Sequence, residues 1–164
     1  MAATGGQGLD PCSLMTAAEI TAITTDVVTK ADRNDATCNY RSDPKDGTQV
    51  TVYATGGAKQ METVRASARL LGGMGASVAD KGGAGADVNT LLKPDKTKAP
   101  ALGDEAMWEL NDTLAVRKGD AFVEVSPPIM HDPATHTGYP LVKKEEKRAI
   151  AEAIATKALE KLAH

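Results

Sequence analysis

The amino-acid sequence predicts an α+β protein: a single domain with an antiparallel sheet of about five strands and helices packed mainly on one face. Three observations predict this class. Residues 49–55 alternate apolar and polar side chains, as a half-buried strand does. Strand-like runs at 106–110, 113–118 and 121–126 are separated only by short turn signals. Residues 141–162 repeat apolar side chains at helical spacing.

The length of 164 residues suits one domain with a real core. We expect residues 1–8 to be a disordered N-terminal segment and residues 9–164 to form the domain. A flexible Gly-rich connector is expected near residues 72–100. Aromatic residues make up only 3% of the chain, so the core must be built mainly from aliphatic side chains.

The first half of the chain predicts a helix, a hairpin and a second helix. Thr16 followed by Glu19 is a capping box, which predicts a helix start. Residues 36–41 and 49–55 are expected to pair as a hairpin. The second helix is predicted from apolar residues at helical spacing, with an end at Gly-Gly: Met61, Val64, Ala68, Leu71, then Gly72 and Gly73.

The second half predicts a short helix, a meander and a long helix. The short helix is expected at about 86–92, inside the connector. The turn formers Asn111-Asp112 and Gly119-Asp120 separate the strand-like runs, which favours a three-stranded meander. Residues 141–162 complete the domain as its clearest helix.

Cys12 and Cys38 are the only two cysteines, and we predict a disulfide that joins the first helix to the first strand. Closing a loop of this size contributes about 3–4 kcal/mol in the chain-entropy model. Two free buried thiols are the alternative, because a free cysteine packs as a small hydrophobe. A two-cysteine metal site is less favoured, since no His or third Cys stands at ligand spacing. A disulfide indicates an oxidising, extracytoplasmic location.

Charge and hydropathy exclude two classes of protein. The net charge of −3, without a basic run among aromatics, argues against a nucleic-acid partner. The chain has no run of about 18 apolar residues, so we predict no transmembrane segment. We expect a monomer without cofactors, whose partner is a cell-envelope protein or a small ligand. We interpret Met1–Gly8 as the start of a mature chain, secreted or lipid-anchored, after removal of a signal peptide, and the start of a native cytoplasmic chain is the alternative.

Two sets of side chains are candidates for binding. The scarce aromatics Trp108, Tyr53, Tyr40 and Tyr139 are candidate ligand-binding residues, with core packing as the alternative for Trp108. His131 and His136, with Met130, lie in a Pro-rich loop and are candidate metal ligands for zinc or copper. An ordinary connecting loop is the alternative for that second set.

The sequence shows no catalytic motif, so we predict a protein that is not an enzyme. Its serines lack a nucleophile-elbow context, and its Gly-rich segments lack the Gly-Lys-Ser/Thr ending of a phosphate loop. The preferred function is a non-enzymatic extracytoplasmic binding module. The alternatives are a metal-binding protein that uses the 131–136 loop, and a secreted hydrolase with an unrecognised site.

Short motifs in the chain resemble a family of bacterial secreted proteins and lipoproteins, mainly actinobacterial, whose domain has no known function. The motifs are at residues 10–20, 38–40, 102–108, 114–120 and, as an Ala-rich helix, 149–162. The resemblance implies an extracytoplasmic domain with one disulfide, and it supplies no catalytic residues. Residues 132–139 differ from the family pattern as an insertion, and the visible start lacks a lipid-anchor motif.

Overall fold

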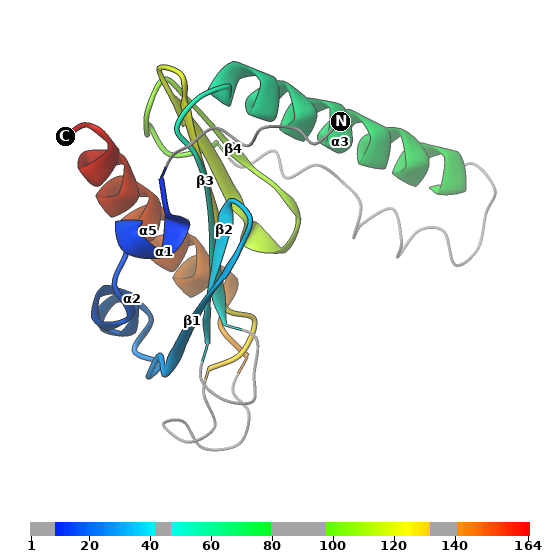
Figure 1. Ribbon diagram of the computed structural model, residues 1–164. Helices are drawn as coiled ribbons and strands as arrows, with labels where there is room; N and C mark the ends of the chain where they lie inside the picture. The colour runs from blue at the N-terminus through cyan, green and yellow to red at the C-terminus, as the bar shows by residue number, and fades with distance from the viewer. Residues whose placement is uncertain (1–8, 42–46, 80–97, 132–140) are drawn as a thin grey trace.

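The computed structural model describes residues 9–41, 47–79, 98–131 and 141–164. The described residues form one six-stranded antiparallel sheet, in the order β1-β2-β3-β6-β5-β4, with helices on both faces (Figure 1). The α+β prediction is therefore confirmed, with one strand more than expected. The predicted disordered segment 1–8 and the predicted short helix at 86–92 lie outside the described residues.

The N-terminal half contributes two short helices and three strands. Asp10 caps α1 (Pro11–Leu14), and the Thr16–Glu19 capping box begins α2 (Ala17–Thr24) as predicted. Strands β1 (Lys30–Asn34), β2 (Thr37–Arg41) and β3 (Thr48–Tyr53) then form a meander, which includes the predicted hairpin of β2 and β3.

The C-terminal half contributes the other three strands. Strands β4 (Glu105–Trp108), β5 (Leu114–Lys118) and β6 (Ala121–Ser126) form the predicted meander. The Asn111-Asp112 separator lies in a short 3₁₀ helix (Leu110–Asp112), in which both residues have positive φ. The chain ends in α5 (Lys144–Leu162), which confirms the predicted last helix.

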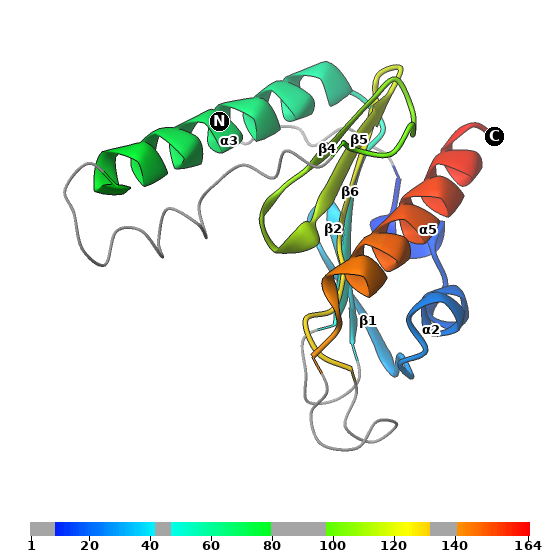
Figure 2. The ribbon, with the colours of Figure 1, turned by 180° about the vertical axis from the view of Figure 1, so that it is seen from behind.

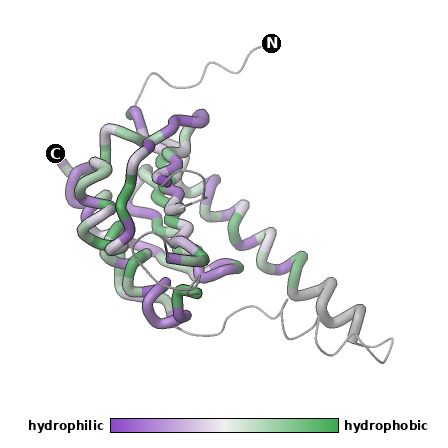
Figure 3. Tube along the Cα trace, turned by 90° about the horizontal axis from the view of Figure 1, so that it is seen from below, coloured by the Kyte–Doolittle hydropathy of each residue, from purple (hydrophilic) through white to green (hydrophobic). Residues whose placement is uncertain are grey.

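One face of the sheet carries the main core. The helices α1, α2 and α5 lie on this side, and α3 lies on the other (Figures 1 and 2). Alternate residues of the strands point into the core, and Figure 3 shows the resulting mixture of hydropathy along the trace. The core is mostly aliphatic, as the composition requires, and among its fully or almost fully buried members are Ile20, Val50, Val116, Val123, Val125, Ile150 and Ile154.

Helix α3 (Gly57–Ala79) packs on the opposite face by its first turns, where Met61 and Val64 lie against Ala115 and Phe122. The prediction that Gly72-Gly73 ends this helix is wrong. The helix continues to Ala79, because a glycine inside a helix costs only about 1 kcal/mol relative to alanine. The predicted connector therefore starts later, and its residues 80–97 lie outside the described part of the chain.

Two contacts attach α3 to the sheet. A Cβ at Gly57 would lie 2.6 Å from the carbonyl oxygen of Ala121, so only glycine allows this approach to the β5–β6 turn. Further along the helix, the Arg65 guanidinium forms two hydrogen bonds with Glu105 on β4, at 2.8 and 2.9 Å. This pairing with Arg65 holds the pKa of the Glu105 carboxyl below its usual range.

The predicted disulfide is confirmed. Cys12 of α1 is bonded to Cys38 of β2, with their Cα atoms 5.0 Å apart, and Cys38 is fully buried in the main core. The bond fixes α1 to β2 and closes a chain segment that contains α2 and β1. Among the described residues, no helix combines the length and apolarity that a membrane crossing requires.

We expect the double variant Cys12→Ala/Cys38→Ala to lose about 3 kcal/mol of unfolding free energy, because its unfolded chain regains the entropy that the bond removes. Urea unfolding with and without reductant measures this. Reductant should destabilise the wild type and leave the double variant unchanged. Equal urea midpoints for the oxidised wild type and the variant would contradict a stabilising bond.

Candidate functional site

Two of the candidate aromatic residues lie inside the main core. Tyr40 is 1% exposed, and its hydroxyl donates a hydrogen bond of 2.7 Å to the carbonyl oxygen of Met15. Burial raises the pKa of the Tyr40 phenol to about 12. Trp108 is also buried, with the guanidinium of Arg148 4.6 Å from its ring centroid. Both rings are packing residues in this structure, and neither presents a face to solvent.

The structure does not place the remaining aromatic candidates beside Tyr40 and Trp108. Tyr53 is on the opposite face of the sheet, where its ring centroid lies 6.3 Å from that of Phe122. Tyr139 lies outside the described residues. The structure therefore brings together no two of Tyr40, Tyr53 and Trp108 at a common surface.

The candidate metal ligand His131 is buried between two carboxylates. Its Nδ1 lies 3.1 Å from Asp26 Oδ2, and its Nε2 lies 2.9 Å from Glu146 Oε1. Asp26 follows α2 and Glu146 stands in the first turn of α5, so the imidazole links these two elements.

The other proposed ligands of that site give it no further support. Met130 forms an isolated β-bridge with Leu141, and His136 lies outside the described residues. Within residues 9–41, 47–79, 98–131 and 141–164, no group of three His, Cys, Asp or Glu side chains could hold a metal ion.

The most distinctive surface is a polar band on the face of the sheet that α3 covers only in part. Strand register aligns its side chains in two rows across β1, β2, β3 and β6. The first row is Asp32, Asn39, Gln49 and Ser126, and the second row is Asn34, Thr37, Thr51 and Glu124. We call these eight residues the polar band. On β2, β3 and β6, the residues of the band alternate with buried residues of the same strand, so these strands have a dry face and a polar face.

Hydrogen bonds link the hydroxyl groups of this face. The Thr37 and Thr51 hydroxyls are 2.7 Å apart across β2 and β3. The Ser126 hydroxyl is 3.0 Å from that of Thr113, next to β5. These pairs hold side chains in fixed positions, which makes the band a preorganised surface.

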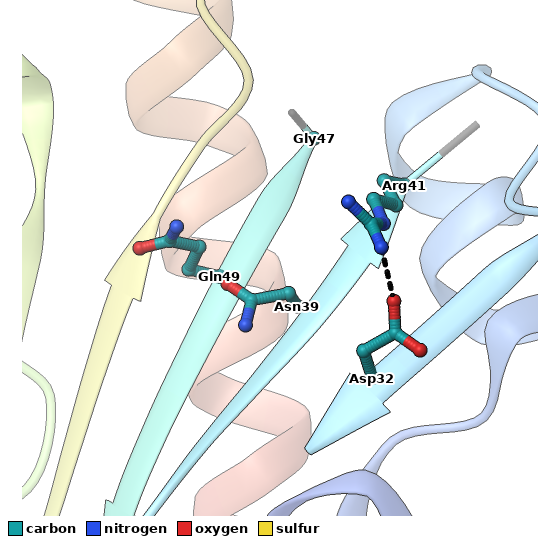
Figure 4. Close-up of a pocket in the computed structure, with 5 residues that line it drawn as sticks. All are labelled: Asp32, Asn39, Arg41, Gly47 and Gln49. Atoms are coloured by element: carbon teal, nitrogen blue, oxygen red, sulfur yellow. Dashed lines mark hydrogen bonds and ion pairs between the residues drawn. The ribbon is translucent and has the colours of Figure 1, made fainter. Parts of the chain in front are cut away.

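The polar band ends in a hollow of about 200 Å³ between β1, β2 and β3, lined by Asp32, Asn39, Arg41, Gly47 and Gln49 (Figure 4). Arg41 Nη2 is paired with Asp32 Oδ2 at 2.6 Å. The side chains of Asn39 and Gln49 lie next to each other on neighbouring strands. The hollow is thus built from charged and amide groups, without an aromatic ring in its described lining.

A pair of carboxyl groups occupies the other end of the face. Glu109 and Glu124 are partly buried and within hydrogen-bonding reach of each other. Burial and the neighbouring Glu124 carboxyl raise the pKa of Glu109 to about 7, and burial also raises the pKa of Glu124. Glu109 Oε1 is buried without a hydrogen-bond partner. Such a pair can share one proton near neutral pH.

The fold and these surfaces define a disulfide-linked α+β domain whose sheet has one core face and one polar face. Comparison of the chain with protein-family models, curated proteins and solved structures finds no match.

Sequence reasoning missed the polar band, the hollow and the Glu109–Glu124 pair. The strand alternation did carry part of the signal, because Thr51 and Glu124 each stand between two valines. What it lacked was the pairing of β3 with β6, which joins residues about 75 positions apart. Without that pairing, the polar positions of each strand could not be assigned to one surface.

Replacing Tyr40 with phenylalanine should destabilise the protein by about 1 kcal/mol, because the buried Met15 carbonyl loses its hydrogen-bond donor. Urea unfolding measures the loss. Tyr53→Phe is the matched control, and its half-exposed hydroxyl should contribute less than about 0.5 kcal/mol. Equal losses in the two variants would contradict the buried anchoring role of Tyr40.

The Glu109–Glu124 pair should make stability fall as the pH rises. The folded pKa of Glu109 is about 7 and its ordinary value is 4.5. The stabilisation by the protonated form is therefore complete below about pH 4.5 and is lost as the pH rises through about 7.

Urea midpoints at about pH 5 and pH 8 test this dependence. The wild type should lose more stability between them than Glu109→Gln, whose amide does not titrate. Subtracting the loss of stability of Glu109→Gln from that of the wild type removes the contribution of the titratable groups that both proteins contain. Identical pH dependence in both would rule out a shifted carboxyl at this position.

Proposed function

We propose that this chain is an extracytoplasmic, non-enzymatic binding module and that the polar band is its binding surface. The observation that carries the proposal is the band itself, in which polar side chains are aligned across four strands. A sheet face that only contacts solvent does not require its polar side chains to be paired or aligned. Here hydroxyl pairs, two adjacent amides and a hollow are arranged on a rigid sheet, which is how binding sites are usually positioned.

The proposed location outside the cytoplasm is supported by the disulfide. Disulfides persist in oxidising compartments and are rare in the reducing cytosol. The Cys12–Cys38 bond reaches the buried core, so it contributes to the fold and is not an exposed regulatory pair. The resemblance to secreted actinobacterial proteins supports the same location, and we propose a bacterial cell-envelope component as the source of the ligand.

The two alternative functions have less support. For metal binding, His131 is already engaged at both nitrogens by Asp26 and Glu146. For hydrolysis, Glu109 supplies an acid with a raised pKa. The Thr37–Thr51 and Thr113–Ser126 hydroxyl pairs have no hydrogen bond to a histidine among the described residues, so no activated nucleophile is indicated.

The test is an NMR titration of the ¹⁵N-labelled oxidised protein with a soluble muramidase digest of bacterial cell walls, which contains both glycan and peptide fragments. We expect shift changes at amides of β1, β2, β3 and β6, the strands that carry the polar band. No change, or changes confined to α1, α2 and α5, would refute the proposed surface.

Matched variants control for nonspecific effects. Gln49→Arg places a bulky charge in the band and should abolish the shift changes. Thr63→Arg makes the same change in charge on the exposed side of α3 and should leave them intact. Both positions are exposed, so both variants should fold.

A further inference from the structure

The hollow at the end of the polar band indicates the chemical class of the ligand. Its described lining consists of an aspartate, an asparagine, an arginine, a glycine and a glutamine, so these residues offer an apolar ligand little apolar surface to bury. Its volume of about 200 Å³ is smaller than sites for drug-sized molecules, which begin at roughly 300 Å³. The hollow suits one compact polar group and is too small for an extended segment.

The two charges in the described lining of the hollow cancel. Arg41 and Asp32 form a short ion pair of 2.6 Å across β2 and β1 (Figure 4). A phosphate would have to compete with Asp32 for the guanidinium, and a metal cation would have to compete with Arg41 for the carboxylate. The electrostatics therefore favour a neutral ligand over either ion.

Two groups in the hollow have unused hydrogen-bonding capacity. The side-chain amides of Asn39 and Gln49 are cross-strand neighbours, and neither has a hydrogen-bond partner among the described residues. Each amide has both donors and an acceptor. Arg41 Nε also lacks a partner among the described residues, but it is buried, so a ligand oxygen in the hollow does not reach it without a shift of the Arg41 side chain.

We propose that the hollow binds one sugar ring of a neutral carbohydrate. Adjacent sugar hydroxyls both donate and accept hydrogen bonds, which matches the paired amides of Asn39 and Gln49. The assignment rests on the proposed function, because it names the ligand class for the same surface.

The test is an NMR titration of the oxidised protein with chitotriose, maltotriose and mannotriose, each up to about 20 mM. The probes for the competing classes are a blocked alanine tripeptide and inorganic phosphate. We expect at least one sugar to bind with a Kd of about 1 mM and to shift amides around Asn39, Arg41 and Gln49. The tripeptide and phosphate should leave these amides unshifted.

Substitutions test whether the sugar binds in the hollow. Asn39→Ala and Gln49→Ala should each weaken sugar binding at least fivefold, and Thr63→Ala on α3 should not change it. Gln49 and Thr63 are both exposed, so this pair keeps the comparison valid if Asn39→Ala does not fold. An unchanged Kd in Gln49→Ala would overturn the assignment.

The outcomes separate this inference from the proposed function. If none of the sugars binds and the cell-wall digest still shifts the polar band, the carbohydrate assignment fails and the binding surface stands. Tripeptide or phosphate binding at the hollow without sugar binding likewise overturns the carbohydrate assignment alone. If neither the sugars nor the digest shifts the band, both proposals fail.

Discussion

The antiparallel pairing of β3 with β6 is the constraint on which the rest of the structure depends. It joins the meander of the N-terminal half to the meander of the C-terminal half, and so makes one sheet from two separate groups of strands. Its register sets Val50 opposite Val125 and Thr51 opposite Glu124. A shift of one residue would expose the valines and bury the polar side chains, so the same register defines the core and the polar band.

The helices pack on the two faces of the sheet according to the apolar area of each face. The dry face is covered by α1, α2 and α5, and the Cys12–Cys38 bond joins α1 to β2. On the other face, the first turns of α3 pack on a small apolar area that includes Ala115 and Phe122. Because that apolar area is limited, the rest of the face keeps its amides, hydroxyls and carboxyls. The limited packing of α3 therefore leaves a surface on which a ligand could bind.

Several elements follow from local chemistry and were predictable. The Thr16–Glu19 capping box, the β2–β3 hairpin and the C-terminal meander are each coded by residues close together in sequence. Two elements differ from expectation for physical reasons. Strand β1, Lys30–Asn34, has no apolar alternation because it is an edge strand with exposed side chains, and it exists by pairing with β2. Gly72-Gly73 does not end α3 because each glycine only weakens a helix, and no proline follows between residues 74 and 79.

Periodicity and composition were enough to predict the α+β class, the disulfide partners and the aliphatic character of the core. Which side chains share a surface became clear only in the folded chain. Folding buried Tyr40 and Trp108, which a scarcity of aromatics had suggested as ligand residues, and it engaged His131 with two distant carboxylates. It also assembled Asp32, Asn39 and Gln49 into one hollow. Such groupings depend on strand order and register. Both arise from long-range pairing, so the sequence of a single segment does not indicate them.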